Sequence, residues 1–333
     1  MPLRPRRRRA LVALAAALAF VAGACGGGGG DDPETKSEPD DAADETPQFV
    51  AQVASYELVA GRPQRFMTGL VANGTGSVVS FGTIDLEFFY LGTKEEPVEP
   101  PVAKGTAKAT FLPVGDHDAA GDAPREVRPS EGLGVYEARD VTFDTAGFWG
   151  VRIVATIDGE EVELDRAFEV IAEPRLPFPG SPAPRTANPT IASAGAESPV
   201  VDSRAGPGKP VPDAELHSST VAEALAAGRP VVVVVSTPVY CVSRFCGPIT
   251  DRVASLAKMH GDRAAFVHIE VWENFEDKIV NPAALEWIRP KGGGDIQEPW
   301  VYLVGGDGIV KERFDNIASD QQLTEAVDRL VGG

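Results

Sequence analysis

The 333-residue sequence has few of the reactive and metal-binding residue types on which many enzyme active sites depend. It contains three cysteines, four histidines and three methionines, and aromatic residues make up only 7% of the chain. It has no Ser-His-Asp order, no phosphate-binding glycine loop and no Cys/His cluster with zinc-finger spacing. These absences argue against the common hydrolase, nucleotide-binding and zinc-finger classes. The few cysteines are therefore the main candidates for chemistry.

Positive charge is also scarce. Lys and Arg number 31 against 49 Asp and Glu, which gives a formal net charge of −18. If residues 1–24 are removed, five arginines and no acid leave with them, and the charge becomes −18 − 5 = −23. A chain this acidic is repelled by nucleic acids and by anionic lipid headgroups. We therefore expect no nucleic-acid partner.

Long apolar runs are missing everywhere except near the N-terminus. Arg6 to Arg9 precede an uncharged apolar stretch, Ala10 to Ala24, which is too short for a comfortable membrane span but typical of an export signal. The segment Val21-Ala22-Gly23-Ala24-Cys25 resembles a bacterial lipobox. This resemblance implies lipidation of Cys25 and a protein anchored to the cell membrane on its extracytoplasmic side. The alternative is ordinary secretion with a free Cys25.

Composition divides the chain further. Five glycines and an acidic stretch follow Cys25, and this composition predicts a disordered tether. Ten prolines lie between Pro174 and Pro212, which indicates a linker. We therefore expect five segments: a signal peptide over 1–24, a tether over 25–46, a β-sandwich domain over 47–172, a linker over 173–214 and a second domain over 215–333.

The first domain is expected to be all-β. Apolar residues alternate over Val78 to Tyr90 and over Trp149 to Ile157, and Asp158-Gly159 separates the second run from Glu161 to Val170. An Asp-Gly pair between two alternating runs is a strong hairpin signal. Several short strands with turn signals predict an immunoglobulin-like sandwich.

One segment of this domain is relevant to copper binding. The stretch Gly134 to Val151 resembles bacterial periplasmic β-sandwich modules, some of which bind copper. Copper sites need His and Met ligands, and this region offers only His117 and Met67. A spacer or docking role is therefore favoured for the sandwich.

The second domain alternates between strand and helix patterns. Pro230 to Ser236 is a continuous apolar run, as in a buried strand. Helices are expected over Ser218 to Ala227 and Pro248 to His260, and a further strand over Ala264 to Val271. A hairpin from Trp300 to Phe314 and a closing helix from Ser319 complete the pattern.

This order resembles the thioredoxin family, and in particular thioredoxin-like domains of exported bacterial proteins. Cys241 follows the apolar strand where that family has its nucleophile, and Glu298-Pro299-Trp300 precedes the hairpin where the family has a cis-proline beside the disulfide. The resemblance implies two domains, an all-β immunoglobulin-like sandwich and then an α/β thioredoxin-like fold with a central mixed sheet flanked by helices. It also implies that Cys241 attacks substrates, that Cys246 resolves the mixed disulfide, and that the Pro299 loop presents backbone groups to the substrate.

The cysteine pair departs from the family pattern. Four residues separate Cys241 from Cys246, where the family has two. Positions i and i+5 lie on different faces of a regular helix, so a disulfide requires an irregular turn before the helix. Gly247-Pro248 follows the pair, and proline suits a first helical turn, so Cys246 is expected at a helix N-terminus.

Two further positions complicate the expected chemistry. The family's buried acid corresponds here to Val235, so that proton relay is missing. Glu298 stands where an apolar residue or Thr is usual. Glu298 and Arg244 are expected to act on the thiols in opposite directions. Together with Pro299 and Trp300, these two residues are the predicted substrate contacts.

The sequence allows several interpretations of the cysteine pair. We predict a thiol–disulfide oxidoreductase without a cofactor, whose partners are protein thiols or disulfides and a membrane or extracytoplasmic redox protein. A permanent structural disulfide and a non-catalytic docking protein are alternatives. A copper carrier similar to Sco-type chaperones is another, with Cys241, Cys246 and His268 as ligands. A peroxiredoxin is disfavoured, because Thr237 lies one residue too far from Cys241.

Overall fold

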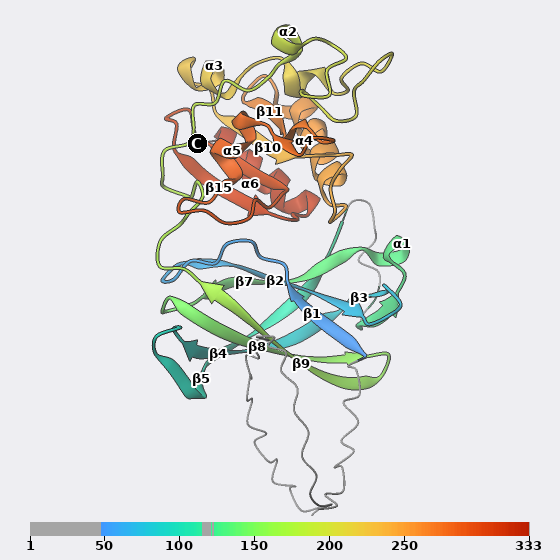
Figure 1. Ribbon diagram of the computed structural model, residues 1–333, viewed down its shortest axis with the longest axis vertical. Coiled ribbons are helices and arrows are strands. Elements are labelled where there is room, and N and C mark those ends of the chain that lie inside the picture. The colour runs from blue at the N-terminus through green and yellow to red at the C-terminus, as the bar shows by residue number, and fades with distance from the viewer. Residues whose placement is uncertain (1–47, 115–120, 122, 333) are drawn as a thin grey trace, which may run out of the picture. The chain divides into compact units, whose positions relative to one another are not determined.

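The computed structural model describes residues 48–114, 121 and 123–332 (Figure 1). The predicted signal peptide, Cys25, the tether and His117 lie outside these residues. The described residues belong to one compact unit, Pro47–Gly333. None of its described helices is long and apolar enough to cross a membrane.

The first part of this unit is a nine-stranded antiparallel sheet, which we call the large sheet. Its strands are β1 (Phe49–Val53), β2 (Pro63–Ala72), β3 (Val78–Ser80), β4 (Thr83–Gly92), β5 (Pro97–Pro113), β6 (Arg125–Val127), β7 (Gly134–Thr142), β8 (Gly147–Ile157) and β9 (Glu160–Val170). The order across the sheet is β6-β3-β2-β7-β5-β4-β8-β9, and β1 also pairs with β2. A single helical turn, α1 (Pro129–Gly132), lies between β6 and β7.

Strand β5 makes the large sheet continuous. It pairs with β4 over most of its length and with β7 over its last four residues, and Thr110 has partners in both neighbours. The first strand contacts the last, β9, so the sheet folds over on itself around one core. Five aromatic side chains meet edge-on or tilted in that core: Phe66, Phe88, Phe143, Trp149 and Phe168.

The predicted hairpin is confirmed. Strands β8 and β9 pair along their whole length up to Ile157 and Glu160, so Asp158-Gly159 is a two-residue turn. Both turn residues have positive φ, 49° for Asp158 and 91° for Gly159. Asp and Gly tolerate this conformation better than other residues, which is why the pair specifies the turn.

The second part contains a small four-stranded sheet. Its order is β11 (Ala265–Glu270), β10 (Val231–Ser236), β14 (Trp300–Val304) and β15 (Val310–Asp315). Strands β12 (Trp272–Asn274) and β13 (Ile279–Val280) form a separate pair. The helices are α2 (Ile191–Ala194), the 3₁₀ helix η1 (Ala214–His217), α3 (Val221–Ala226), α4 (Cys246–His260), α5 (Pro282–Ile288) and α6 (Asp320–Gly332).

The valine run of β10 is fully buried, as predicted, because it packs on both faces. Val231, Val233 and Val235 pack with residues of α3 and α5. Val232 and Val234 pack with residues of α4 and α6 on the other side. Since side chains alternate along a strand, five consecutive valines require apolar partners on both faces.

The fold class predicted from the sequence is wrong. The chain is mostly β, with a single antiparallel sheet of nine strands as its dominant element, and not an immunoglobulin-like sandwich followed by an α/β thioredoxin-like fold. The sandwich prediction failed because β5 connects the two layers by hydrogen bonds. Alternation of apolar residues shows which strands have a buried face but not where one sheet ends.

The large sheet contacts the second part through a buried polar network. Arg65 on β2 forms ion pairs with Glu137 on β7, at 3.3 Å, and with Asp315 at the end of β15, at 3.2 Å. Gln322 on α6 donates a hydrogen bond of 2.9 Å to the Glu137 carboxylate. Glu137 is only 6% exposed, so these partners compensate the loss of its hydration.

Residues 173–214, predicted as a linker, contain several buried side chains. Leu176 packs in the core beside β10, and Thr186 donates a hydrogen bond of 2.6 Å to Glu286 on α5. Asp202 has no exposed surface. The predicted domain boundaries themselves stay a prediction.

Candidate functional site

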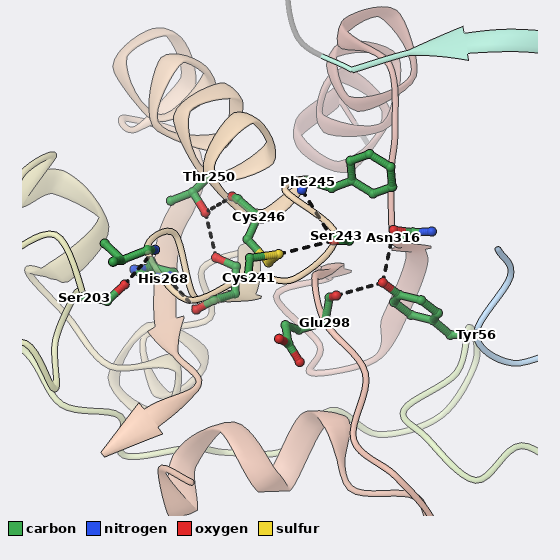
Figure 2. The surroundings of a disulfide bond; sticks show 12 residues. Tyr56, Ser203, Cys241, Ser243, Phe245, Cys246, Thr250, His268, Glu298 and Asn316 are labelled. Carbon is green, nitrogen blue, oxygen red and sulfur yellow. Dashed lines mark hydrogen bonds between the residues drawn. A yellow bond between two sulfur atoms is a disulfide. The ribbon is translucent and has the colours of Figure 1, made fainter. Parts of the chain in front are cut away.

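Cys241 and Cys246 form a disulfide between the end of β10 and the start of α4 (Figure 2). Their Cα atoms are 6.0 Å apart, within the usual range for a disulfide. The residues between them are not helical, and Arg244 has a left-handed φ of 64°. This is the irregular turn that the spacing of five requires.

The two cysteines differ in accessibility. Cys241 is half-buried, and its neighbour Val242 is 94% exposed. Cys246 has no exposed surface. Cys241 is therefore the member of the pair that keeps some exposed surface, whereas Cys246 is completely covered.

The N-terminus of α4 is open toward Cys246. As predicted, Cys246 is the first residue of the helix. The preceding Phe245 provides no side-chain cap, and the first turn contains no acidic residue. The positive end of the helix dipole is thus free to stabilise a negative charge on the Cys246 sulfur.

Hydroxyl groups hold the loop in place. Thr250 donates a hydrogen bond of 2.7 Å to the Cys246 carbonyl, and its hydroxyl lies 2.6 Å from that of Ser236 at the end of β10. Ser243 lies within the loop, with its Oγ 3.2 Å from the Sγ of Cys241 (Figure 2). A hydroxyl at this distance can donate to a thiolate at Cys241.

Phe245, between the cysteines, packs against the large sheet. It is 8% exposed and belongs to an apolar group that we call the clamp cluster. The buried members of this cluster are Met67, Leu112, Val114, Val135, Phe245 and Ile317. The large sheet therefore restrains the cysteine loop directly.

Glu298 lies in the surroundings of the disulfide (Figure 2), and the Glu298–Pro299 peptide bond is cis, as predicted. The Tyr56 hydroxyl donates a bond of 2.7 Å to the Glu298 carbonyl, and it lies 3.1 Å from the Asn316 Oδ1. The Asn316 backbone N–H donates to the Pro299 carbonyl at 2.9 Å. Tyr56 comes from the large sheet region, so both parts of the unit shape this site.

The predicted substrate contacts differ in accessibility. Pro299 is buried, and Trp300 is 1% exposed, stacked on Tyr302 with the Arg313 guanidinium 5.0 Å from its ring. Arg244 is exposed and makes no hydrogen bond or ion pair with the described residues. Of these side chains, Arg244 is the one most open to a partner.

Two carboxyl groups near the site have unusual acidity. Burial raises the pKa of Glu298, and the nearby Glu270 carboxylate raises it further. Burial also raises the pKa of Glu270, which accepts a hydrogen bond of 2.8 Å from the Ser203 backbone N–H. The pair therefore retains protons more strongly than exposed glutamates.

His268, the third ligand of the copper alternative, has other neighbours. Its Nε2 lies 3.1 Å from the Ser236 carbonyl, and its Nδ1 lies 3.4 Å from Asp202 Oδ2. With Asp202 and His217 it forms a buried cluster. The copper set with both cysteines stays a prediction.

Sequence reasoning missed several residues that the fold brings to this region: Tyr56, Asp202, Ser203, His217 and Asn316. Each lies far along the chain from the cysteines, and none belongs to a recognisable short motif. Asp202 sits inside the proline-rich segment, whose composition indicated only a linker. No local signal could have identified these residues.

Comparisons with known proteins give no family for this chain. No family model matches it, and no curated protein matches it. A solved structure reported as "Crystal structure of BslA - A bacterial hydrophobin" is similar at 10% identity and a TM-score of 0.18, over 38% of this chain and 94% of that one. A likeness this weak supports no argument about fold or function.

The family assignment made from the sequence is therefore corrected. The chain is not identified as a thioredoxin family member, because no family matches and the mostly β architecture does not support the assignment. The features behind that resemblance are local: a cysteine after a buried strand, and Glu-Pro before a hairpin. Such short-range features do not determine a family.

Proposed function

We propose that this protein is an extracytoplasmic, membrane-anchored thiol–disulfide oxidoreductase that exchanges disulfides with protein substrates through Cys241 and Cys246. The observation that carries the proposal is the asymmetry of the pair. One cysteine is accessible beside an exposed Val242, and the other is buried at the start of α4. Exchange needs one sulfur that can be attacked and one that leaves readily.

In the oxidising direction, a substrate thiolate attacks the Sγ of Cys241. A bond forms between substrate and Cys241, the bond to Cys246 breaks, and Cys246 leaves as a thiolate at the N-terminus of α4. A second substrate thiolate then attacks the substrate sulfur of the mixed disulfide, and Cys241 leaves as a thiolate. The substrate loses two electrons, the pair gains them, and the protons pass through solvent.

The reverse sequence reduces a substrate disulfide. The Cys241 thiolate attacks the substrate, and Cys246 then attacks Cys241 and releases the reduced substrate. In either direction a redox partner at the membrane or outside it returns the pair to its starting state. Lipidation of Cys25 would hold the protein at the membrane, where it would meet both its substrates and its redox partner.

The surface near Cys241 suits an unfolded or extended polypeptide. Val239 and Val242 are exposed at 53% and 94%. Tyr240 stacks on Phe275 with ring centroids 3.9 Å apart. Apolar side chains of a polypeptide can pack on these groups while its sulfur reaches Cys241.

Single cysteine variants test the proposal. Cys246→Ser removes the resolving thiol, and the remaining Cys241 should accumulate mixed disulfides with protein partners, seen as reducible bands on non-reducing gels. Cys241→Ser should accumulate far fewer, because Cys246 is buried. Ser243→Ala, which keeps both cysteines, is the matched control and should trap none.

Two results would count against the proposal. Trapping chiefly by Cys241→Ser would reverse the roles of the two cysteines. If neither variant traps a partner and both fold, the pair is not an exchange centre.

A further inference from the structure

Three potential metal ligands from separate segments meet inside the second part of the unit. Asp202 comes from the proline-rich segment, His217 is the last residue of η1, and His268 lies on β11. Their exposed fractions are 0%, 0% and 1%. One ligand atom of each lies within 4.8 Å of the others.

The two distances from Asp202 to the histidines fit tetrahedral coordination. The Asp202 Oδ2 is 3.5 Å from the His217 Nε2 and 3.4 Å from the His268 Nδ1. In a tetrahedral zinc site with bonds of about 2.0–2.1 Å, neighbouring ligand atoms are about 3.3–3.4 Å apart. These separations are long for direct hydrogen bonds but suit a shared ion.

The hydrogen bonds around His268 explain why a cation belongs there. Its Nε2 lies 3.1 Å from the Ser236 carbonyl, which can only accept, so Nε2 carries the hydrogen. The other ring nitrogen, Nδ1, lies 3.4 Å from the Asp202 Oδ2, so an ion between these two atoms would bind both of them. Metal-bound histidines characteristically donate their other ring N–H to a carbonyl or carboxylate.

His217 supplies an independent observation. Neither of its ring nitrogens has a hydrogen-bond partner among the described residues, although the side chain is fully buried. Burial of a polar group without a partner is costly. The Nε2 of His217 faces the same Asp202 oxygen as the Nδ1 of His268 does, so one ion would give a partner to one nitrogen of each ring.

The surrounding charges leave room for a dication. Arg204 binds both carboxylate oxygens of Asp202, but it is shared with two other acids. The connected network has four carboxylates and two side-chain cations: Asp202, Asp213, Glu215, Asp251, Arg204 and Lys258. These six side chains have a net charge of 2 − 4 = −2, which one divalent cation neutralises.

We propose that Asp202, His217 and His268 bind a zinc ion. Two imidazoles and one carboxylate are an established zinc ligand set, and tetrahedral spacing favours Zn²⁺ over metals that prefer square-planar or octahedral geometry. The ion connects three segments that are otherwise far apart in the sequence. Its main effect is therefore to stabilise this part of the fold.

The same ion would also steady the cysteine loop. Ser203, next to Asp202, accepts a hydrogen bond of 3.2 Å from the Val239 backbone N–H through its Oγ. His268 contacts the carbonyl of Ser236, the last residue of β10, through its Nε2. The site thus fixes the loop leading to Cys241 from two sides, whether or not the disulfide is redox-active.

Metal content and spectroscopy test the inference. The whole protein, treated with a chelator and then dialysed against Zn²⁺, should contain one zinc per chain and unfold at a higher temperature than the chelated protein. With Co²⁺ in place of Zn²⁺, it should show the visible absorption bands of tetrahedral coordination. Because this readout needs no exchange activity, it separates this inference from the proposed function.

Variants locate the site. His217→Ala should lower zinc affinity by more than the roughly 10–100-fold typical for loss of an outer partner. His260→Ala is the matched control, since His260 is largely buried on α4 but outside the cluster, and it should retain one zinc. If His217→Ala does not fold, zinc titration of the wild-type protein by calorimetry still decides the question.

Two results would refute the proposed zinc site. A folded wild-type protein that takes up no zinc at micromolar concentrations would refute the site. So would nitrogen NMR showing His268 doubly protonated with zinc present, because the proton would then occupy the position assigned to the ion.

Discussion

The large sheet and the second part of the unit bury different kinds of side chain. The core of the large sheet is aliphatic and aromatic, and five of its aromatic rings are connected by edge-on or tilted contacts. The second part buries Asp202, His217, His268 and Glu270. Burying ionisable groups costs free energy unless they are paired, and such groups tend to gather at functional sites. The contrast is consistent with the proposed function, in which the second part carries the chemistry and the sheet has a mainly structural role.

The division is not complete, because the large sheet reaches the disulfide at two points. Phe245 is buried in the clamp cluster, and Tyr56 donates to the Glu298 carbonyl. The sheet's own buried acid, Glu137, lies where it meets α6. The sheet therefore acts on the site through these contacts, and not through catalytic groups of its own.

The sharpest test of the contrast truncates the aromatic core. Phe143 is 1% exposed and contacts Phe66, Phe88, Trp149 and Phe168. Phe143→Ala should lower the free energy of unfolding by about 3–5 kcal/mol, because it leaves a cavity. Denaturant unfolding measures this, and the redox equilibrium of the folded protein should not change. A clear shift of that equilibrium would show that the two regions are coupled throughout.

A matched truncation in the clamp cluster should behave differently. Met67 is also fully buried, but it belongs to the same cluster as Phe245. Met67→Ala should cost about 2–5 kcal/mol of stability. It should also loosen the loop and lower the effective concentration of one thiol near the other, so the disulfide becomes easier to reduce.

We expect Met67→Ala to change the equilibrium constant for reduction of the disulfide by about threefold to tenfold. This corresponds to a rise in reduction potential of up to roughly 30 mV. Equilibration in glutathione buffers measures it, with Phe143→Ala as the comparison. Identical potentials for Met67→Ala and the wild type would remove the role assigned to the clamp.

The raised pKa of Glu298 predicts a smaller, pH-dependent effect. The folded state favours the protonated form of Glu298, because its pKa is higher there than in the unfolded chain. The contribution of this carboxyl to stability is therefore complete below the unfolded pKa of about 4.3. It is lost as the pH rises through the higher pKa of the folded state. Glu298→Gln stays neutral at every pH. The variant should therefore gain stability over the wild type at pH 8 but not at pH 4.

Urea unfolding at the two pH values checks this, and Glu276→Gln, at an exposed carboxyl, should show no such difference. A Glu298→Gln variant with the same relative stability at both pH values would contradict the assigned burial cost.

The smallest expected effect compares two left-handed residues, one in each region. Arg244 has φ 64° and no polar partner among the described residues, whereas Asp158 has φ 49° and accepts a 3.0 Å bond from the Glu126 N–H. Left-handed backbone costs a non-glycine residue about 1–2 kcal/mol, but glycine adds about 0.4–1 kcal/mol of unfolded-state entropy. Arg244→Gly should therefore stabilise by up to about 1 kcal/mol. Asp158→Gly should stabilise less or destabilise, since it also loses a hydrogen bond. Thermal unfolding of both variants tests the ordering, and a larger gain at position 158 would refute it.

The sequence predicted local features better than global ones. The Asp158-Gly159 turn, the buried valines of β10 and the helix start at Cys246 follow from backbone preference and apolar spacing. The fold class did not follow, because β5 joins two layers through pairings distant in sequence. The ligand cluster of Asp202, His217 and His268 also escaped prediction, because it depends on how a proline-rich segment packs against β11.

The reduction potential of the Cys241–Cys246 disulfide tests the central claim most directly. It is measured by equilibrating the folded protein in glutathione and dithiothreitol buffers of known potential and quantifying free thiols. The account predicts a value between about −120 and −270 mV, the range of thiol–disulfide oxidoreductases. A value below about −300 mV would mean a permanently closed structural bond and would contradict the proposed function.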